Sequence, residues 1–173
     1  MPKSSLEINA LAFAKHAHKD QRRKYTNEPY IVHPIQVAKY IKSVTNDPTS
    51  IAAALLHDVV EDTSYTYEDI LINFGKEVAD LVEMLTDIST PEDGDRAARK
   101  LIDKKHTALA SPKAKTIKLA DLLSNIPSII KYDPEFAKVY LKEKKALLEV
   151  LVEGDTILYL HVKDIINNYY KAS

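Results

Sequence analysis

Four ionisable side chains lie close together in the segment AAALLHDVVED, residues 52–62: His57, Asp58, Glu61 and Asp62. The other residues of the segment are apolar, and its length suits a buried helix better than a strand. At about 100° per residue, the four side chains fall within an arc of roughly 140°. Because burying such groups is costly unless they pair or bind a metal, we expect a functional site here rather than a solvated helix face.

Metal sites draw ligands from several elements, and two further residues have suitable surroundings. His33 precedes Pro34 in the context PYIVHP, and Asp121 lies in IKLADLLSNI, where Lys118 and Asn125 share its helical face. Alone, His33 could be a helix cap and Asp121 a buried acid paired with a basic residue. Together with His57 and Asp58 they give two imidazoles and two carboxylates, a mixture that suits Mn, Fe or Zn better than Ca or Mg.

Composition limits the classes of function. With 45% hydrophobic and 28% charged residues, the 173-residue chain has the composition of a globular protein with one ordinary domain. Its net charge of -1 argues against a nucleic-acid-binding surface, and it has no cysteine for thiolate chemistry. Only three glycines are present, so Gly-rich phosphate loops are excluded. Without a signal-like or membrane-spanning run, we expect a cytoplasmic protein that does not engage membranes.

Helical periodicity dominates the chain, and no convincing strand or hairpin is found. We expect an all-α, compact single-domain bundle of eight to ten helices over residues 1–173. A capping pattern at Ser4 and Glu7 opens the first helix, Asp47-Pro48 opens the central one, and Pro127 should end or kink a later one. The remaining helices are expected near residues 34–41, 66–75, 76–86, 96–110, 111–125, 134–152 and 155–170.

The motifs HxPxxVA, ALLHDVVEDT and IKLADLLSN closely resemble those of HD-domain metal-dependent phosphohydrolases. Within that superfamily the chain is similar to the hydrolase domain of RelA/SpoT homologues, especially the small alarmone hydrolases. The resemblance covers nearly the whole chain and implies a 3′-pyrophosphohydrolase that converts ppGpp or pppGpp to GDP or GTP and pyrophosphate. It also implies one divalent metal, typically Mn²⁺, with the ligands His33, His57, Asp58 and Asp121.

The same resemblance implies roles for residues that do not bind the metal. Glu61 and Asp62 match the residues that handle the attacking water. Their position agrees with this role, because a carboxylate one helical turn after the ligands His57 and Asp58 can accept or relay the proton of that water. Arg23 and Lys24 match the basic pair that holds the nucleotide, and Asn125 matches an amide near its sugar and phosphates. Taken alone, the QRRK segment would read as a solvated basic loop.

Some positions differ from the family pattern. The sequence after Asp121 reads LADLLSNIPS, where the family has a basic-rich LADRLHNLR or similar, so Leu122 and Pro127 replace arginines. Base and phosphate recognition is therefore altered, and two alternatives stay open. One is a phosphatase for an adenosine alarmone or for the 2′-phosphate of NADPH, and the other is a nucleotide-sensing module without turnover. The other four histidines have no supporting pattern and are interpreted as structural or surface residues: His16, His18, His106 and His161.

Overall fold

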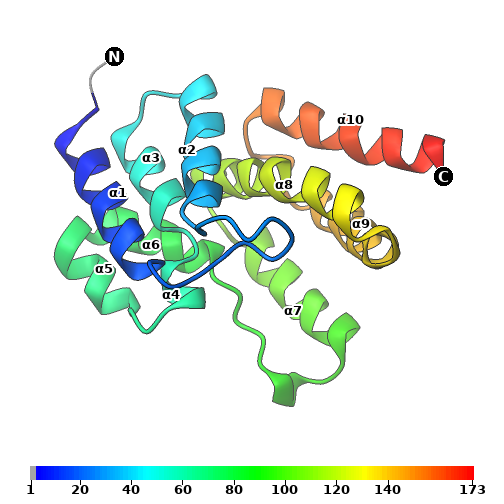
Figure 1. Cartoon of the computed structure of the whole chain (residues 1–173), viewed down its shortest axis with the longest axis horizontal. Coiled ribbons are helices and arrows are strands. Elements are labelled where there is room, and N and C mark those ends of the chain that lie inside the picture. Colours follow the sequence, from blue (N-terminus) through cyan, green and yellow to red (C-terminus); the bar gives the residue numbers. More distant parts are fainter. Residues whose placement is uncertain (1–2) are drawn as a thin grey trace. The chain divides into compact units, whose positions relative to one another are not determined.

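The computed structural model describes residues 3–173, and these form ten α-helices and one short 3-10 helix (Figure 1). Within this range there is no strand; the only β-type pairing is an isolated bridge between Arg22 and Pro29. The expected all-α fold is therefore confirmed. No described helix is both long enough and apolar enough to cross a bilayer. The helices group into two compact units that meet in sequence between Thr86 and Asp87.

The first unit contains six helices. They are α1 (Ser5–Ala17), α2 (Val32–Val44), α3 (Pro48–Leu56), α4 (Val59–Asp62), α5 (Tyr67–Phe74) and α6 (Lys76–Leu85). Side-chain caps begin three of them as the sequence predicts, because Ser4, Asp47 and Thr66 each accept a hydrogen bond from a backbone N–H of the first turn. Gly75, with a φ of 88°, ends α5 and precedes α6.

Helix α3 is the centre of this unit. Every residue from Ser50 to Leu56 is buried, and α3 packs against α1, α2 and α6 (Figure 1). The prediction of one continuous helix over residues 52–62 is wrong, because α3 ends at Leu56 and α4 begins at Val59. Asp58 lies between them with φ −100° and ψ −1°, away from regular helix geometry. His57 and Asp58, two of the predicted metal ligands, therefore lie in the break between two helices.

The second unit contains the 3-10 helix η1 (Pro91–Asp93) and four α-helices. They are α7 (Arg96–Ala108), α8 (Pro112–Tyr132), α9 (Pro134–Leu148) and α10 (Thr156–Ala172). The long helix α8 contacts both α9 and α10, and its fully buried apolar residues include Ile117, Leu122 and Ile126. Asp121 lies on this same helix, so the core of the unit holds it in place.

Pro127 lies inside α8, so the prediction that it ends or kinks a helix near Asn125 is wrong in placing the end there. A proline removes one backbone hydrogen bond and disfavours continuation of a helix. Here Pro127 itself is exposed, whereas Ile126 is buried and Ile129 and Ile130 are partly buried. Burial of these apolar side chains on both sides of the proline outweighs the local loss.

Candidate metal and phosphate site

The turn between α3 and α4 fixes the orientation of His57. Its Nδ1 lies 2.7 Å from the carbonyl oxygen of Ala54, and since a carbonyl can only accept, Nδ1 carries the hydrogen. The neutral ring then presents the lone pair of Nε2, which is the form in which histidine binds a metal. The helix break therefore selects the tautomer of His57.

His33 and His57 converge on one carboxylate. The Nε2 atom of His57 lies 3.0 Å from Oδ2 of Asp58, and that of His33 lies 3.4 Å from the same oxygen. One ligand atom from each of the three residues lies within 4.8 Å of the others, and both rings are almost fully buried. Two imidazole nitrogens and a carboxylate oxygen aimed at one point form a donor set that fits a divalent transition metal. The first unit therefore brings together three of the four predicted ligands.

Two carboxylates border this cluster. Glu61 and Asp62 belong to α4 and are exposed to solvent, and their role in handling the attacking water stays a prediction. Desolvation, together with the nearby Asp58 carboxylate, raises the pKa of Asp62, while the Gln21 amide, which donates to its Oδ2 at 3.2 Å, acts in the opposite direction. A carboxyl group with a raised pKa is a stronger proton acceptor once it is ionised.

The predicted basic pair lies in the irregular segment between α1 and α2. The backbone N–H of Arg23 donates to Glu28, and Asn27 donates back to Arg23, so the segment forms a tight loop with a positive φ at Asn27. Arg23 is partly buried, and Lys24 is exposed with its Nζ 5.2 Å from the ring centre of Tyr25. Backbone pairing thus orders this loop, and its role in substrate binding stays a prediction.

The fourth predicted ligand, Asp121, is buried in the second unit. Lys118 Nζ lies 3.1 Å from its Oδ2, and the Asn125 amide donates to its Oδ1 at 3.0 Å. The prediction that these three residues share one face of a helix is confirmed. Metal-binding carboxylates are commonly held by such outer hydrogen bonds. The assignment of Asp121 as a ligand, and of Asn125 to the substrate, stays a prediction.

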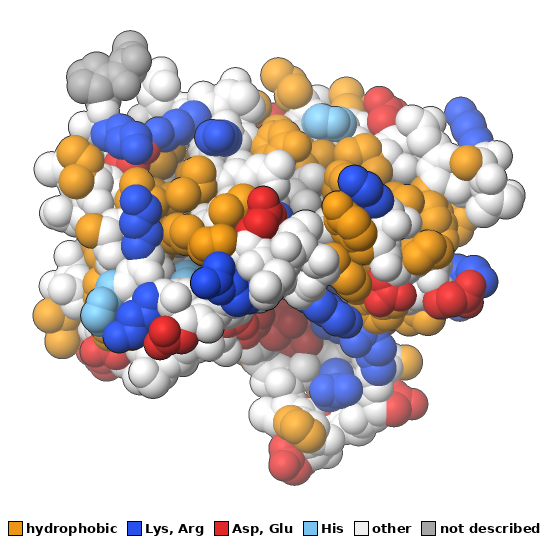
Figure 2. Space-filling model, viewed as in Figure 1, with side chains coloured by type: hydrophobic (Ala, Val, Ile, Leu, Met, Phe, Trp, Pro, Cys, Tyr) orange, Lys and Arg blue, Asp and Glu red, His pale blue; other side chains and the backbone are white. Residues whose placement is uncertain are grey.

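The second unit also contains a basic cavity with a volume of about 520 Å³, which no sequence pattern indicated. Figure 2 shows Lys and Arg side chains gathered over the part of this unit where α7 and α9 lie. Arg96 forms a paired hydrogen bond with Glu143, at 2.6 and 3.0 Å, and so links α7 to α9 beside the cavity. Three acidic and six basic side chains line it, the basic ones being Arg96, Lys100, Lys104, Lys118, Lys142 and Lys144.

Lys144 is an unusual member of this group. Desolvation and the nearby Lys118 and Lys100 lower its pKa to about 8, and its Nζ lies 4.8 Å from the ring centre of Tyr140. Neither Lys144 nor Lys142 forms a salt bridge with any described residue, whereas Arg96, Lys100, Lys104 and Lys118 each have a carboxylate partner. The cavity therefore has uncompensated positive charge, which suits an anionic ligand.

Comparison with known proteins agrees with this geometry. The family profile described as HD domain matches residues 10–148. The chain belongs to the HD-domain family. The match includes every residue of this HD-domain protein that was predicted to bind metal or substrate.

Relatives of this HD-domain protein include named alarmone hydrolases. The Xenopus tropicalis protein called guanosine-3′,5′-bis(diphosphate) 3′-pyrophosphohydrolase MESH1 is 40% identical over 135 residues, which cover 76% of this chain and 74% of that protein. An Aquifex aeolicus guanosine-3′,5′-bis(diphosphate) 3′-pyrophosphohydrolase is 40% identical over 146 residues, 82% of this chain but only 20% of that longer protein. A solved structure described as a metazoan ortholog of SpoT that hydrolyzes ppGpp matches with a TM-score of 0.88 and 30% identity over 98% of both chains.

Proposed function

We propose that this HD-domain protein is a guanosine-3′,5′-bis(diphosphate) 3′-pyrophosphohydrolase, which releases pyrophosphate from ppGpp or pppGpp. The observation that carries the proposal is the convergence of His33, His57 and Asp58, within 4.8 Å, in a chain whose relatives bear that name. The activity is assigned to residues 1–173 as one hydrolase domain, and a cytoplasmic location is part of the same proposal.

We assign the metal site to His33, His57, Asp58 and Asp121, with Mn²⁺ as the preferred ion. Support comes from the mixed imidazole and carboxylate donors and from the hydrogen bonds that orient His57 and Asp121. A bound divalent ion supplies two things: it lowers the pKa of a coordinated water, and it neutralises charge on the phosphoryl group.

Glu61 and Asp62 are assigned to proton transfer. Both are solvent-exposed, and they follow the Asp58 ligand by three and four residues on the short helix α4. A carboxylate in this position can accept the proton of the attacking water and pass it to solvent or to the leaving group. Retention of both acids also favours an enzyme over a sensor, which needs ligands but no proton acceptors.

Substrate phosphates are assigned to basic side chains from two sources. On the ordered loop, Arg23 offers a planar guanidinium with several hydrogen-bond donors, and Lys24 offers an ammonium group. Asn125 offers a side-chain amide beside Asp121. A role of the basic cavity in binding phosphate is supported by Lys118, which lines the cavity and contacts Asp121. Lys142 and Lys144 would then compensate for the arginines that are absent after Asp121.

Product analysis tests the proposed function. The purified protein would be incubated with Mn²⁺ and a panel containing ppGpp, pppGpp, an adenosine alarmone and NADPH, and the released phosphates would be resolved by ³¹P NMR. We expect pyrophosphate from the guanosine alarmones. Orthophosphate from NADPH or from the adenosine alarmone, without pyrophosphate from the guanosine alarmones, would identify the phosphatase alternative, and binding without any product would identify a sensor.

A further inference from the structure

His18 is a buried histidine that the predicted mechanism does not use. It follows α1 as its C-cap and is only 2% exposed. Its Nδ1 lies 2.7 Å from Gln21 Oε1, while its Nε2 is buried and has no hydrogen-bond partner among the described residues. A buried ring nitrogen without a hydrogen-bond partner costs free energy, so the presence of a histidine at this position calls for an explanation.

The direction of each hydrogen bond follows from Asp62. An ionised carboxylate only accepts, so the group of Gln21 that faces Asp62 Oδ2 at 3.2 Å is its NH₂. The oxygen of the same amide therefore faces His18. Because this oxygen can only accept a hydrogen bond, Nδ1 of His18 must carry the hydrogen and donate it. His18 thus determines which end of the Gln21 amide is presented to Asp62.

Backbone bonds hold this network rigid. Gln21 donates its N–H to the carbonyl of His18 at 2.9 Å, and Tyr30 donates to the carbonyl of Gln21 at 2.9 Å. The rings of His18 and Tyr30 lie 4.9 Å apart, and the Tyr30 hydroxyl donates to Asp58 Oδ2 at 2.6 Å. One buried imidazole therefore supports two contacts, one to the carboxylate of Asp62 and one to that of Asp58.

We propose that His18 is a positioning residue for hydrolysis. By fixing the Gln21 amide, it holds one oxygen of Asp62 and sets the orientation of this carboxylate before substrate binds. The inference rests on the proposed function, because it takes Asp62 to be a proton-handling group. His18 itself touches neither the reacting atoms nor the cluster of metal-binding side chains.

Substitutions at His18 separate positioning from packing. His18→Leu removes the donor and keeps an apolar side chain, whereas His18→Asn places an amide N–H where Nδ1 was. We expect His18→Leu to lower kcat about 10- to 100-fold, the usual effect of losing an outer hydrogen-bond partner, with KM and metal content unchanged. His18→Asn should recover most of that loss. Gln21→Met, at a partly exposed position, should reproduce the His18→Leu effect.

The decisive comparison is a double-variant cycle with Asp62→Asn. If His18 acts through Asp62, adding His18→Leu to Asp62→Asn will cause no further fall in kcat. Additive losses, or equal losses in His18→Asn and His18→Leu, would overturn the proposal.

A crystal structure of His18→Leu gives a test that does not depend on turnover. The proposal expects the Gln21–Asp62 hydrogen bond to be lost, and its retention would contradict the proposal. Absence of turnover by the parent protein on every nucleotide would instead count against the proposed function, and the crystal structure would still decide the role of His18.

Discussion

The histidine cluster of the first unit and the basic cavity of the second differ in how closely their parts are fixed. Donor atoms of three predicted ligands, His33, His57 and Asp58, lie within 4.8 Å of one another, and a backbone carbonyl orients His57. The cavity instead spreads six cations over α7, α8 and α9 around about 520 Å³. Bond-making chemistry needs fixed geometry, whereas attraction of a polyanion needs mainly charge. The first region is therefore suited to catalysis and the second to capture of substrate.

Glu61→Gln, which tests the catalytic role of the first unit, should give the largest change in activity. The amide keeps the shape of the side chain but cannot accept the proton, so kcat should fall by about 10² to 10⁴. KM, metal content and melting temperature should stay near those of the parent. Measuring all four on one preparation checks this. A destabilised fold with near-normal kcat would mean that Glu61 only supports neighbouring structure.

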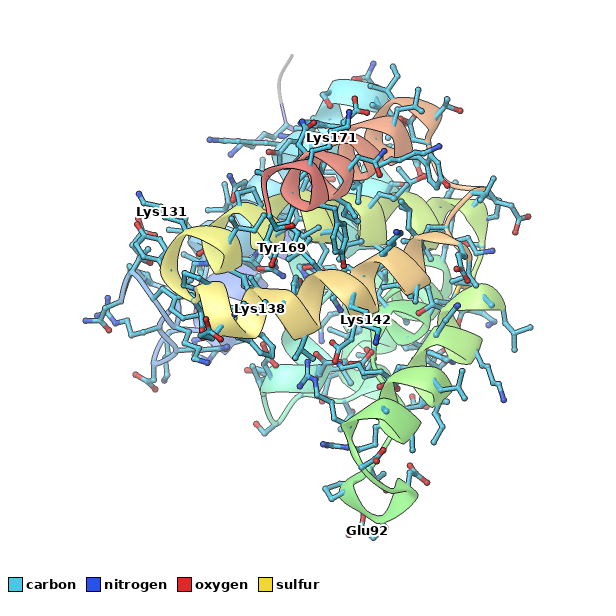
Figure 3. All side chains as sticks on the ribbon, turned by 90° about the vertical axis from the view of Figure 1, so that its right-hand side faces the viewer. Glu92, Lys131, Lys138, Lys142, Tyr169 and Lys171 are labelled. Carbon is cyan, nitrogen blue, oxygen red and sulfur yellow. The ribbon has the colours of Figure 1, made fainter. Side chains whose placement is uncertain are left out.

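Lys142→Ala tests the capture side. Loss of one charge-assisted phosphate contact should raise KM about tenfold and leave kcat nearly unchanged. Lys138→Ala is the matched control, because Lys138 lies along the same helix (Figure 3), is exposed, and does not line the cavity. Equal KM values for these two variants would exclude the cavity from substrate binding.

Arg23→Ala should also raise KM more than it lowers kcat, because Arg23 lies on an ordered loop without ligand chemistry. Steady-state kinetics with the best nucleotide substrate measure both constants. An unchanged KM would remove Arg23 from substrate capture and leave that role to the cavity.

Lys144 gives the smallest expected effect, and it depends on pH. With a pKa of about 8, Lys144 is cationic below that pH and becomes neutral as the pH rises through it. Its attraction for phosphate is therefore present near pH 7 and lost near pH 9, so KM should rise by a few-fold as this one charge contact is lost. Lys144→Arg stays charged and should flatten the profile. At each pH, the KM of the parent is divided by the KM of Lys144→Arg, so that effects of pH on the metal and the substrate cancel. A ratio that is constant from pH 7 to 9 would contradict this role.

The two regions also differ in how far the sequence could predict them. His57 and Asp58 are adjacent, and His33 directly precedes a proline in the first turn of α2, which begins at Val32, so local spacing indicated the cluster and several helix ends. The break at Asp58 and the continuation of α8 through Pro127 depend on tertiary packing, which overrides local preference.

The cavity and the His18 network were not predicted, because they depend on contacts that only the folded chain defines. The cavity cations come from three helices, and no spacing rule joins them. His18 and Gln21 are three residues apart, but only the fold shows that His18 is buried and that Gln21 reaches Asp62. A histidine and a glutamine shortly before the RRK segment were the only signal.

Metal analysis most directly tests the central claim, that His33, His57, Asp58 and Asp121 hold one catalytic ion. The parent and its Asp58→Ala and Asp121→Ala variants would be loaded with Mn²⁺, desalted and measured by inductively coupled plasma mass spectrometry. Asp103→Ala is the control, because Asp103 is a buried acid that is not among the four predicted ligands. We expect one ion per chain in the parent and the control, and little in either ligand variant. Stoichiometric metal retained by both ligand variants would contradict the assignment.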